Sequence, residues 1–163
     1  MFAKKMKTLA LISILAIQTA LCGTPSEALE NFKKAAQSKD FEATWKHAAK
    51  FDSLPEQVTE HLKSKVRKLI VLASKGWDFK VMDEKIDGDC AVVAIKEPKK
   101  NGNTEVDIDP AYLLLQDGEW RVFPDVTGWR IAEDAAKDKV ETYKKLEAWY
   151  KERKIELKKK GNG

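Results

Sequence analysis

Hydrophobic residues between positions 28 and 73 repeat every three or four residues, which is the period of amphipathic helices. The first predicted helix begins at the capping box Thr24-Pro-Ser-Glu27, which has proline at the first helical position. Asp40 is the predicted cap of a second, short helix, and Ser53-Leu-Pro-Glu56 is a capping box that opens a third. Gly76 is suited to end that helix. The pattern therefore predicts three helices before residue 77.

From Trp77 onward the hydrophobic period changes to two, which is typical of strands. The run Cys90–Ile95 is apolar on both faces and therefore predicts a central strand. Thr104–Ile108 alternates with acidic residues and predicts the next strand, with a turn at Asn101-Gly102 between the two.

This turn predicts a register for the two strands. A two-residue turn at these positions would place Ile95 opposite Ile108 and Lys96 opposite Asp107. Apolar side chains would then meet on one face of the sheet and opposite charges on the other.

The last predicted hairpin has the clearest turn signal. Asp117-Gly118 favours a type I′ turn, because both central residues of that turn need a positive φ. In this register Leu115 lies opposite Trp120, and Leu113 lies opposite Val122. The other face carries a second set of residues: Tyr112, Leu114, Arg121 and Phe123. Because a buried indole removes a large area from water, we expect Trp120 to anchor the sheet to the helices.

A final helix is predicted over residues 131–160, with Val140, Tyr143, Leu146 and Tyr150 on one stripe. At ~1.5 Å per residue it would be about 45 Å long, which exceeds the width of a domain of this size. We expect its end to project, to fray or to meet a partner. Together these elements predict an α+β fold with three N-terminal helices on a curved antiparallel sheet, followed by a long C-terminal helix.

The first 22 residues have the pattern of a secretory signal peptide. Three lysines precede the apolar run Leu9–Ile17, which is far shorter than the ~20 residues that span a bilayer. Two ways of processing this signal peptide are consistent with the sequence. Cys22 stands where a lipoprotein signal places its acylated cysteine, although Leu21 before it is larger than that signal prefers. The alternative is ordinary cleavage after Cys22 or Gly23. We therefore expect an exported protein that is free or anchored by lipid.

Composition and charge exclude some functions. The 163 residues are 43% hydrophobic and 34% charged, which suits a folded domain. The net charge of +4 is unevenly distributed. Residues 23–136 carry 17 basic and 21 acidic side chains, whereas residues 137–163 carry ten basic and five acidic ones. A slightly acidic domain lacks the positive surface of nucleic-acid-binding proteins, so no nucleic-acid partner is expected.

Four segments resemble the nuclear transport factor 2-like superfamily, also called the cystatin-like cone fold. They are Thr24-Pro-Ser-Glu27 through Phe32; Lys39-Asp-Phe41; Asp87-Gly-Asp-Cys-Ala-Val92; and Asp117-Gly-Glu-Trp-Arg-Val122. The chain is most similar to the small, exported, often lipid-anchored bacterial members of unknown function. The resemblance covers residues 24–124 and implies a curved sheet wrapped on a helix, around a cone that is filled or holds a ligand. It also allows a homodimer, and for some relatives it implies chemistry by an acidic base.

Few residues are candidates for chemistry. His47 and His61 form no metal-binding pair, and Cys90 lies in an apolar strand, so neither a metal, a cofactor nor a catalytic residue is predicted. Glu105, Asp107 and Asp109 alternate with apolar residues and should face solvent. The candidate ligand-binding residues are Trp45, Tyr112 and Arg121; the last could hold an anion or pair with a neighbouring acid.

These observations favour a non-catalytic exported module that binds a small ligand or an envelope protein. One alternative is a small lyase or isomerase with a buried carboxylate in the cone, whose pKa would be raised. Another is adhesion to a membrane or polymer through the basic C-terminal helix. That helix could also bind a partner through Tyr143, Trp149 and Tyr150.

Overall fold

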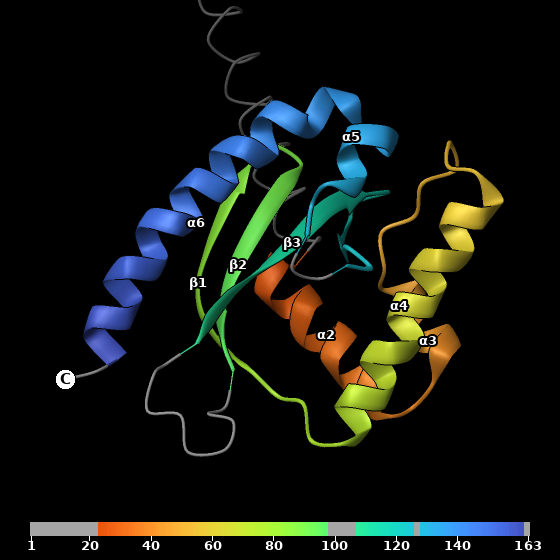
Figure 1. Cartoon of the computed structure of the whole chain (residues 1–163), viewed down its shortest axis with the longest axis horizontal. Coiled ribbons are helices and arrows are strands. Elements are labelled where there is room, and N and C mark those ends of the chain that lie inside the picture. Colours follow the sequence, from red (N-terminus) through yellow and green to blue (C-terminus); the bar gives the residue numbers. More distant parts are fainter. Residues whose placement is uncertain (1–22, 98–106, 126–127, 162–163) are drawn as a thin grey trace, which may run out of the picture.

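The computed structural model describes residues 23–97, 107–125 and 128–161, and it shows a four-stranded antiparallel sheet with helices on both faces (Figure 1). In chain order the elements are α2 (Pro25–Gln37), α3 (Phe41–Lys46), α4 (Glu56–Ser74), β1 (Lys80–Asp87), β2 (Cys90–Lys96), β3 (Ile108–Gln116), β4 (Glu119–Val122), α5 (Ile131–Ala135), a 3₁₀ turn (Lys137–Lys139) and α6 (Val140–Gly161). The predicted α+β class, with three N-terminal helices and a long C-terminal one, is confirmed.

The sheet has the order β1-β2-β3-β4, so each strand pairs with its neighbour in sequence. The last hairpin follows its prediction: Asp117 and Gly118 have φ values of 53° and 77°, and Leu115 lies opposite Trp120. Pro110 lies within β3 at a point that β4 does not reach. Because β3 is there an edge strand, the missing N–H of proline is tolerated.

The predicted register of β2 on β3 is wrong by one residue. Ile95 lies opposite Asp109, and Lys96 lies opposite Ile108. The physical reason is that β2 is apolar on both faces, so its own pattern does not distinguish two registers that differ by one residue. The alternating faces of β3 decide instead, because Tyr112 must face one helical layer and Leu113 the other. The proposed turn at residues 101–102 lies outside the described residues.

The N-terminal helices begin largely as predicted. The Thr24 side chain accepts a hydrogen bond from the N–H of Glu27, whose carboxylate accepts one from the N–H of Thr24, and Asp40 caps α3. The predicted capping box at Ser53 is wrong. Pro55 takes the cap position of α4 in an extended conformation with no side-chain bond, so Ser53 lies too far upstream. Gly76, with φ at 91°, ends α4 as predicted.

One face of the sheet packs against α2 through apolar side chains. Trp120 is 7% exposed and lies in this cluster with Phe32 and Leu29 of α2, which confirms its predicted role as an anchor. Strand β4 packs against α2, and Ala48, which follows α3, forms an isolated β-bridge with Val122. We call this side of the sheet the α2 face.

The opposite side, the α6 face, is covered by the C-terminal segment. The prediction of one helix over 131–160 is wrong, because Ala136 leaves the helical conformation with φ −147° and ψ 60°. The 22 residues of α6 span only ~33 Å. Its end lies against the core instead of projecting, since Leu157 is 6% exposed within the cluster of this face. Tyr143 and Tyr150 are buried there too, so they are not available to a partner.

Among the described residues, no helix is both long and apolar enough to cross a membrane.

Candidate functional site: a cleft between α4 and α6

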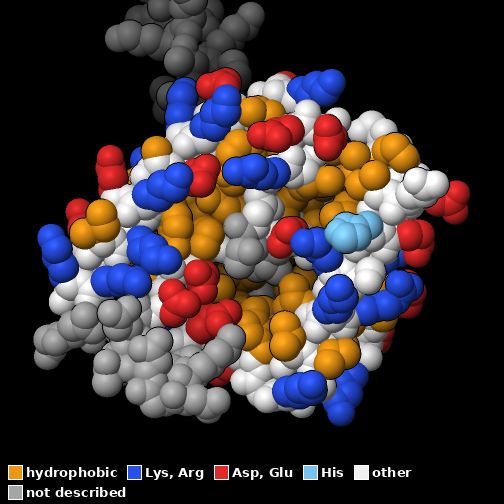
Figure 2. Space-filling model, in the orientation of Figure 1, with side chains coloured by type: hydrophobic (Ala, Val, Ile, Leu, Met, Phe, Trp, Pro, Cys, Tyr) orange, Lys and Arg blue, Asp and Glu red, His pale blue; other side chains and the backbone are white. Residues whose placement is uncertain are grey.

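A cleft of about 380 Å³ opens on the α6 face of the sheet, between α4 and α6. Figure 2 shows hydrophobic side chains in this hollow and charged side chains around it. Its lining comes from α4 (His61, Leu62, Lys65), β3 (Pro110, Tyr112), the segment that leads into α5 (Asp125, Gly128, Trp129, Arg130, Ile131) and α6 (Glu147, Tyr150). The volume is within the range of small-ligand sites.

Of the residues that line this cleft, Tyr112 is the one whose polar group has no evident role in the fold. Its side chain is 2% exposed and packs edge-to-face on Tyr143, with ring centroids 6.1 Å apart. No hydrogen bond joins its hydroxyl to any residue in the described part of the chain, yet the oxygen is not sealed from solvent. Burial raises the pKa of Tyr112, and so do the nearby Glu147 and Tyr150. The hydroxyl therefore stays protonated and free to bond a ligand.

Two neighbouring tyrosines on the same face are satisfied internally. The hydroxyl of Tyr143 donates to the carbonyl oxygen of Leu113 at 2.8 Å, and that of Tyr150 donates to the carbonyl oxygen of Ile108 at 2.6 Å. Burial raises the pKa of both phenols. These two hydroxyls hold α6 on the sheet. Of the three tyrosines, Tyr112 is the one whose hydroxyl forms no such hydrogen bond.

Glu147 lines the cleft with Tyr112, and its charge contributes to the raised pKa of that tyrosine. Its carboxylate accepts a hydrogen bond from the indole Nε1 of Trp129 at 3.2 Å and forms an ion pair with Lys151 at 3.0 Å. The hydrogen bond from Lys151 is the main reason that the pKa of Glu147 is lowered, with further contributions from Trp129 and Arg130. Glu147 is therefore a carboxylate at neutral pH.

The rim of the cleft carries both signs of charge. Lys65 and Asp125 form an ion pair at 2.8 Å, while Arg130 and His61 are exposed. With Glu147 included, two basic side chains and two acidic ones line the cleft alongside a histidine. The site therefore offers no net attraction to a simple anion.

The cleft is better suited to binding than to proton transfer. The alternative of an isomerase requires an interior carboxyl with a raised pKa. Within residues 23–97, 107–125 and 128–161, no Asp or Glu is buried, and the carboxyl groups with a resolved shift have lowered pKa values. The same residues contain no cluster of His, Cys, Asp and Glu that could hold a metal ion.

The structure separates the three predicted ligand-binding residues. Tyr112 lines the cleft, whereas Trp45 stacks on Phe41 and lines a different cavity of about 300 Å³. Arg121 takes the structural role that was its alternative: it forms an ion pair with Glu119 at 2.6 Å and donates to the carbonyl oxygen of Lys46. Cys22 lies outside the described residues.

The remaining candidates have ordinary surroundings. Cys90 is fully buried, and burial raises the pKa of its thiol to about 11. His47 ends α3, and burial together with Arg121 lowers its pKa. His61 lies at the rim of the cleft. Asp107 is exposed, as predicted, whereas Asp109 is only partly exposed, and Glu105 lies outside the described residues.

Sequence analysis missed Glu147, Trp129 and Arg130. One signal was present for Glu147, which is four residues after Tyr143 and three before Tyr150 and so lies on their stripe. A carboxylate among buried aromatic residues is unusual enough to mark a site. Trp129 and Arg130 gave no signal, because only the tertiary structure brings their segment beside α6.

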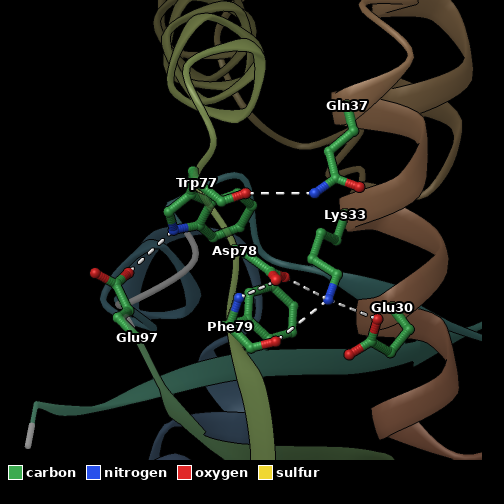
Figure 3. A network of polar contacts seen from close by, with 7 residues as sticks. All are labelled: Glu30, Lys33, Gln37, Trp77, Asp78, Phe79 and Glu97. Atoms are coloured by element: carbon green, nitrogen blue, oxygen red, sulfur yellow. Dashed lines mark hydrogen bonds and ion pairs between the residues drawn. The ribbon is translucent and has the colours of Figure 1, made fainter. Parts of the chain in front are cut away.

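A second polar cluster, drawn in Figure 3, joins α2 to the connection between α4 and β1. The Lys33 ammonium group bonds Glu30 and Asp78 at 2.9 Å each and donates to the Phe79 carbonyl oxygen at 3.3 Å. Burial lowers the pKa of Lys33, but the hydrogen bonds with Glu30 and Asp78 outweigh it, and the net shift is upward.

The same cluster continues to β2. Gln37 donates to the Trp77 carbonyl oxygen at 3.4 Å, and the Trp77 indole donates to Glu97 at 3.0 Å. The polar groups of this cluster bond one another across three elements, so we assign it a structural role.

The fold and the cleft define a class: an α+β protein whose sheet is covered on both faces and which has a ligand-sized cleft beside a long C-terminal helix. No protein-family model matches the chain, and no curated protein matches it. A solved structure from Campylobacter jejuni, described as a "Putative NTF2-like transpeptidase", is similar with a TM-score of 0.49 and 17% sequence identity. The match covers 62% of this chain and 98% of that one.

Proposed function

We propose that this protein is an exported envelope module that binds a small ligand in the cleft between α4 and α6 without transforming it. The observation that carries the proposal is the Tyr112 hydroxyl, which is part of a buried side chain, lines the cleft and bonds no described residue. The hydroxyl oxygen is not sealed from solvent, so water in the cleft can bond it. A ligand in the cleft can take the place of that water and bond the hydroxyl instead.

Two further features support binding of a small molecule. The cleft is lined by apolar and aromatic groups with a few polar ones, which is the usual composition of a ligand site. The lowered pKa of Glu147 favours a fixed charge that orients a ligand over a group that exchanges protons.

A fragment panel tests this proposal. We expect members of a panel of neutral, anionic and cationic fragments to shift the NMR signals of the Trp129 indole and of the amides around Tyr112. Tyr112→Phe should weaken those shifts, whereas Trp45→Phe, in the other cavity, should leave them unchanged. A cleft that responds to no fragment at millimolar concentration would contradict a binding function.

Export is tested by the intact mass of the protein from the membrane and soluble fractions. The leader-like segment supports one of two products: a chain that begins at an acylated Cys22, or one that begins at Gly23 or Thr24. Either product leaves α2 whole, because the helix begins at Pro25. A full-length chain confined to the cytosol would rule out the proposed location.

A further inference from the structure

The C-terminal half of α4 carries exposed hydrophobic side chains. This helix packs against α2 and α3 and lies at the edge of the molecule (Figure 1). Four large hydrophobic side chains among the described residues are exposed, and two of them, Val71 at 51% and Leu72 at 54%, are adjacent on α4. Single exposed hydrophobic residues are common on protein surfaces, so it is the adjacent pair that marks a candidate surface.

Exposed basic residues surround this pair. Arg67, Lys68 and Lys75 are exposed and lie three or four residues from Val71 or Leu72, a spacing that places side chains on one face of a helix. Figure 2 shows basic and hydrophobic side chains side by side at the lower end of this helix. We call these five residues the α4 patch.

The positive charge of the α4 patch is not neutralised by ion pairs. The stretch from His61 to Trp77 contains no Asp or Glu. Arg67, Lys68 and Lys75 form no ion pair within the part of the chain that the structure describes. The guanidinium group of Arg67 lies over the Phe41 ring, 4.6 Å from its centroid, which leaves the charge in place. The patch is therefore a surface for an anionic partner.

Acidic residues on or beside α4 have basic partners of their own. Glu60 lies earlier on the helix and forms an ion pair with Lys63 at 2.6 Å. Asp125 lines a cavity together with Leu72, and it forms an ion pair with Lys65 at 2.8 Å. These pairs leave the basic residues of the α4 patch as the uncompensated charge of the helix.

The basic end of α6 is less suited to an anionic partner. Its exposed hydrophobic residue, Ile155, has Glu152 three positions before it and Glu156 directly after it. Arg153 on the same helix forms ion pairs with Glu156 and, at 2.6 Å, with Asp83. The exposed apolar group of α6 therefore lies among acids, whereas that of α4 lies among uncompensated bases.

The composition of the α4 patch favours a lipid surface over a protein. Protein interfaces are enriched in aromatic residues and depleted of lysine. The patch instead has two aliphatic side chains among basic ones and no aromatic residue. Basic residues are attracted to anionic lipids, and aliphatic side chains beside them can enter the boundary between headgroups and acyl chains.

We propose that the α4 patch binds the surface of an anionic phospholipid bilayer. Arg67, Lys68 and Lys75 contact the lipid phosphates, and Val71 and Leu72 enter between the headgroups. The contact is weak and reversible, because only two half-exposed side chains supply apolar area. This inference is independent of the ligand cleft, whose lining contains no residue of the α4 patch.

Vesicle co-sedimentation of the full chain tests the charge requirement. The probes are vesicles of phosphatidylglycerol and phosphatidylcholine in equal parts, and vesicles of phosphatidylcholine alone. The chain should bind the anionic vesicles at least about tenfold more tightly, because each basic residue at an anionic surface contributes about fivefold. The affinity should fall as salt is added, because salt screens exposed charges.

Matched lysine variants locate the contact, since residues 1–22 are common to all of them. Lys68→Gln combined with Lys75→Gln should weaken binding to anionic vesicles on the order of twentyfold. Lys159→Gln combined with Lys160→Gln removes the same charge from exposed positions on α6 and should weaken it less than about threefold. All four side chains are exposed, so we expect both variants to fold, which far-UV circular dichroism checks.

A second matched pair tests the entry of apolar side chains into the bilayer. Leu72→Ser should weaken binding to anionic vesicles about fivefold, because it removes apolar area that the lipid would bury. Ile155→Ser, at a position of similar exposure on α6, should leave the affinity unchanged.

Several results would overturn the membrane contact. They are equal binding to the two kinds of vesicle, equal effects of the α4 and α6 lysine pairs, and an unchanged affinity of Leu72→Ser. A parent chain that binds no anionic vesicle would overturn it as well, and the α4 patch would then be left to an acidic protein. The fragment panel judges the ligand cleft separately, so either proposal can fail alone.

Discussion

The two faces of the sheet are packed with different chemistry. On the α2 face the buried apolar cluster carries one polar group, the indole N–H of Trp120. The α6 face buries the hydroxyls of Tyr143 and Tyr150, the thiol of Cys90 and the indole of Trp129, and it leaves the hydroxyl of Tyr112 open to the cleft. The difference indicates that the α2 face serves stability alone, whereas the α6 face combines structural hydrogen bonds with a ligand cleft.

The largest expected effect lies on the α2 face. Trp120→Ala should lower the free energy of unfolding by about 3–5 kcal/mol, because the cavity it leaves lies between β4 and α2. Urea denaturation followed by far-UV circular dichroism measures the change. A loss below about 1 kcal/mol would mean that α2 and the sheet are not joined through this residue.

A matched pair on α6 tests whether the end of this helix belongs to the core. Leu157→Ala should cost about 2–4 kcal/mol, because Leu157 is buried against the sheet. Ile155→Ala, two residues earlier and 58% exposed, should stay within about 0.5 kcal/mol of the parent chain. Equal costs for the two variants would show that the helix end projects after all.

The three tyrosines of the α6 face give a smaller and more specific contrast. Tyr143→Phe should cost about 1–2 kcal/mol, because it removes the hydrogen bond to Leu113 and leaves that carbonyl oxygen short of a donor. Tyr112→Phe should change stability by less than about 0.5 kcal/mol or raise it, because no such bond is lost. Thermal and urea unfolding measure both. A cost for Tyr112→Phe as large as that for Tyr143→Phe would make Tyr112 structural.

The smallest effect under ordinary conditions is a dependence of the free energy of unfolding on pH. It is absent at neutral pH. Burial raises the pKa of Cys90 from 9.0 to about 11, so the folded state holds this proton more tightly than the unfolded chain does. The stabilisation is complete below pH 9 and is lost as the pH rises from 9 to 11. Cys90→Ala should flatten this part of the stability curve, measured by urea midpoints. An unchanged slope would assign the alkaline loss to the tyrosines instead.

Several local features could be predicted from sequence because the residues concerned lie close together in the chain. The Asp117-Gly118 turn, the caps at Thr24 and Asp40, and the end of α4 at Gly76 all depend on backbone requirements within a few residues. The register of β2 could not be predicted, because a strand that is apolar on both faces fits two registers. The break at Ala136 could not be predicted either, since the residues on both sides of it favour helix.

The residues of the candidate site, too, could be predicted from sequence only in part. Sequence reasoning found Tyr112 through its place on one face of the last hairpin, but it grouped that residue with Trp45 and Arg121, which the structure places elsewhere. Glu147 could have been identified from the sequence, because it is an acidic residue on the same helical stripe as Tyr143 and Tyr150.

By itself the sequence determined that three helices precede the sheet, and it determined the last hairpin and the two faces of residues 112–116. It did not determine that Ile108 and Tyr112 lie in one strand, β3. The features that it did determine follow from periodicity and turn chemistry, which act over a few residues. The tertiary structure alone decided that α6 lies back on the sheet, that α4 and α6 form the walls of one cleft, and that the hydroxyls of Tyr143 and Tyr150 find carbonyl partners while that of Tyr112 does not. Such pairings join residues thirty or more positions apart, and packing of the whole chain selects them.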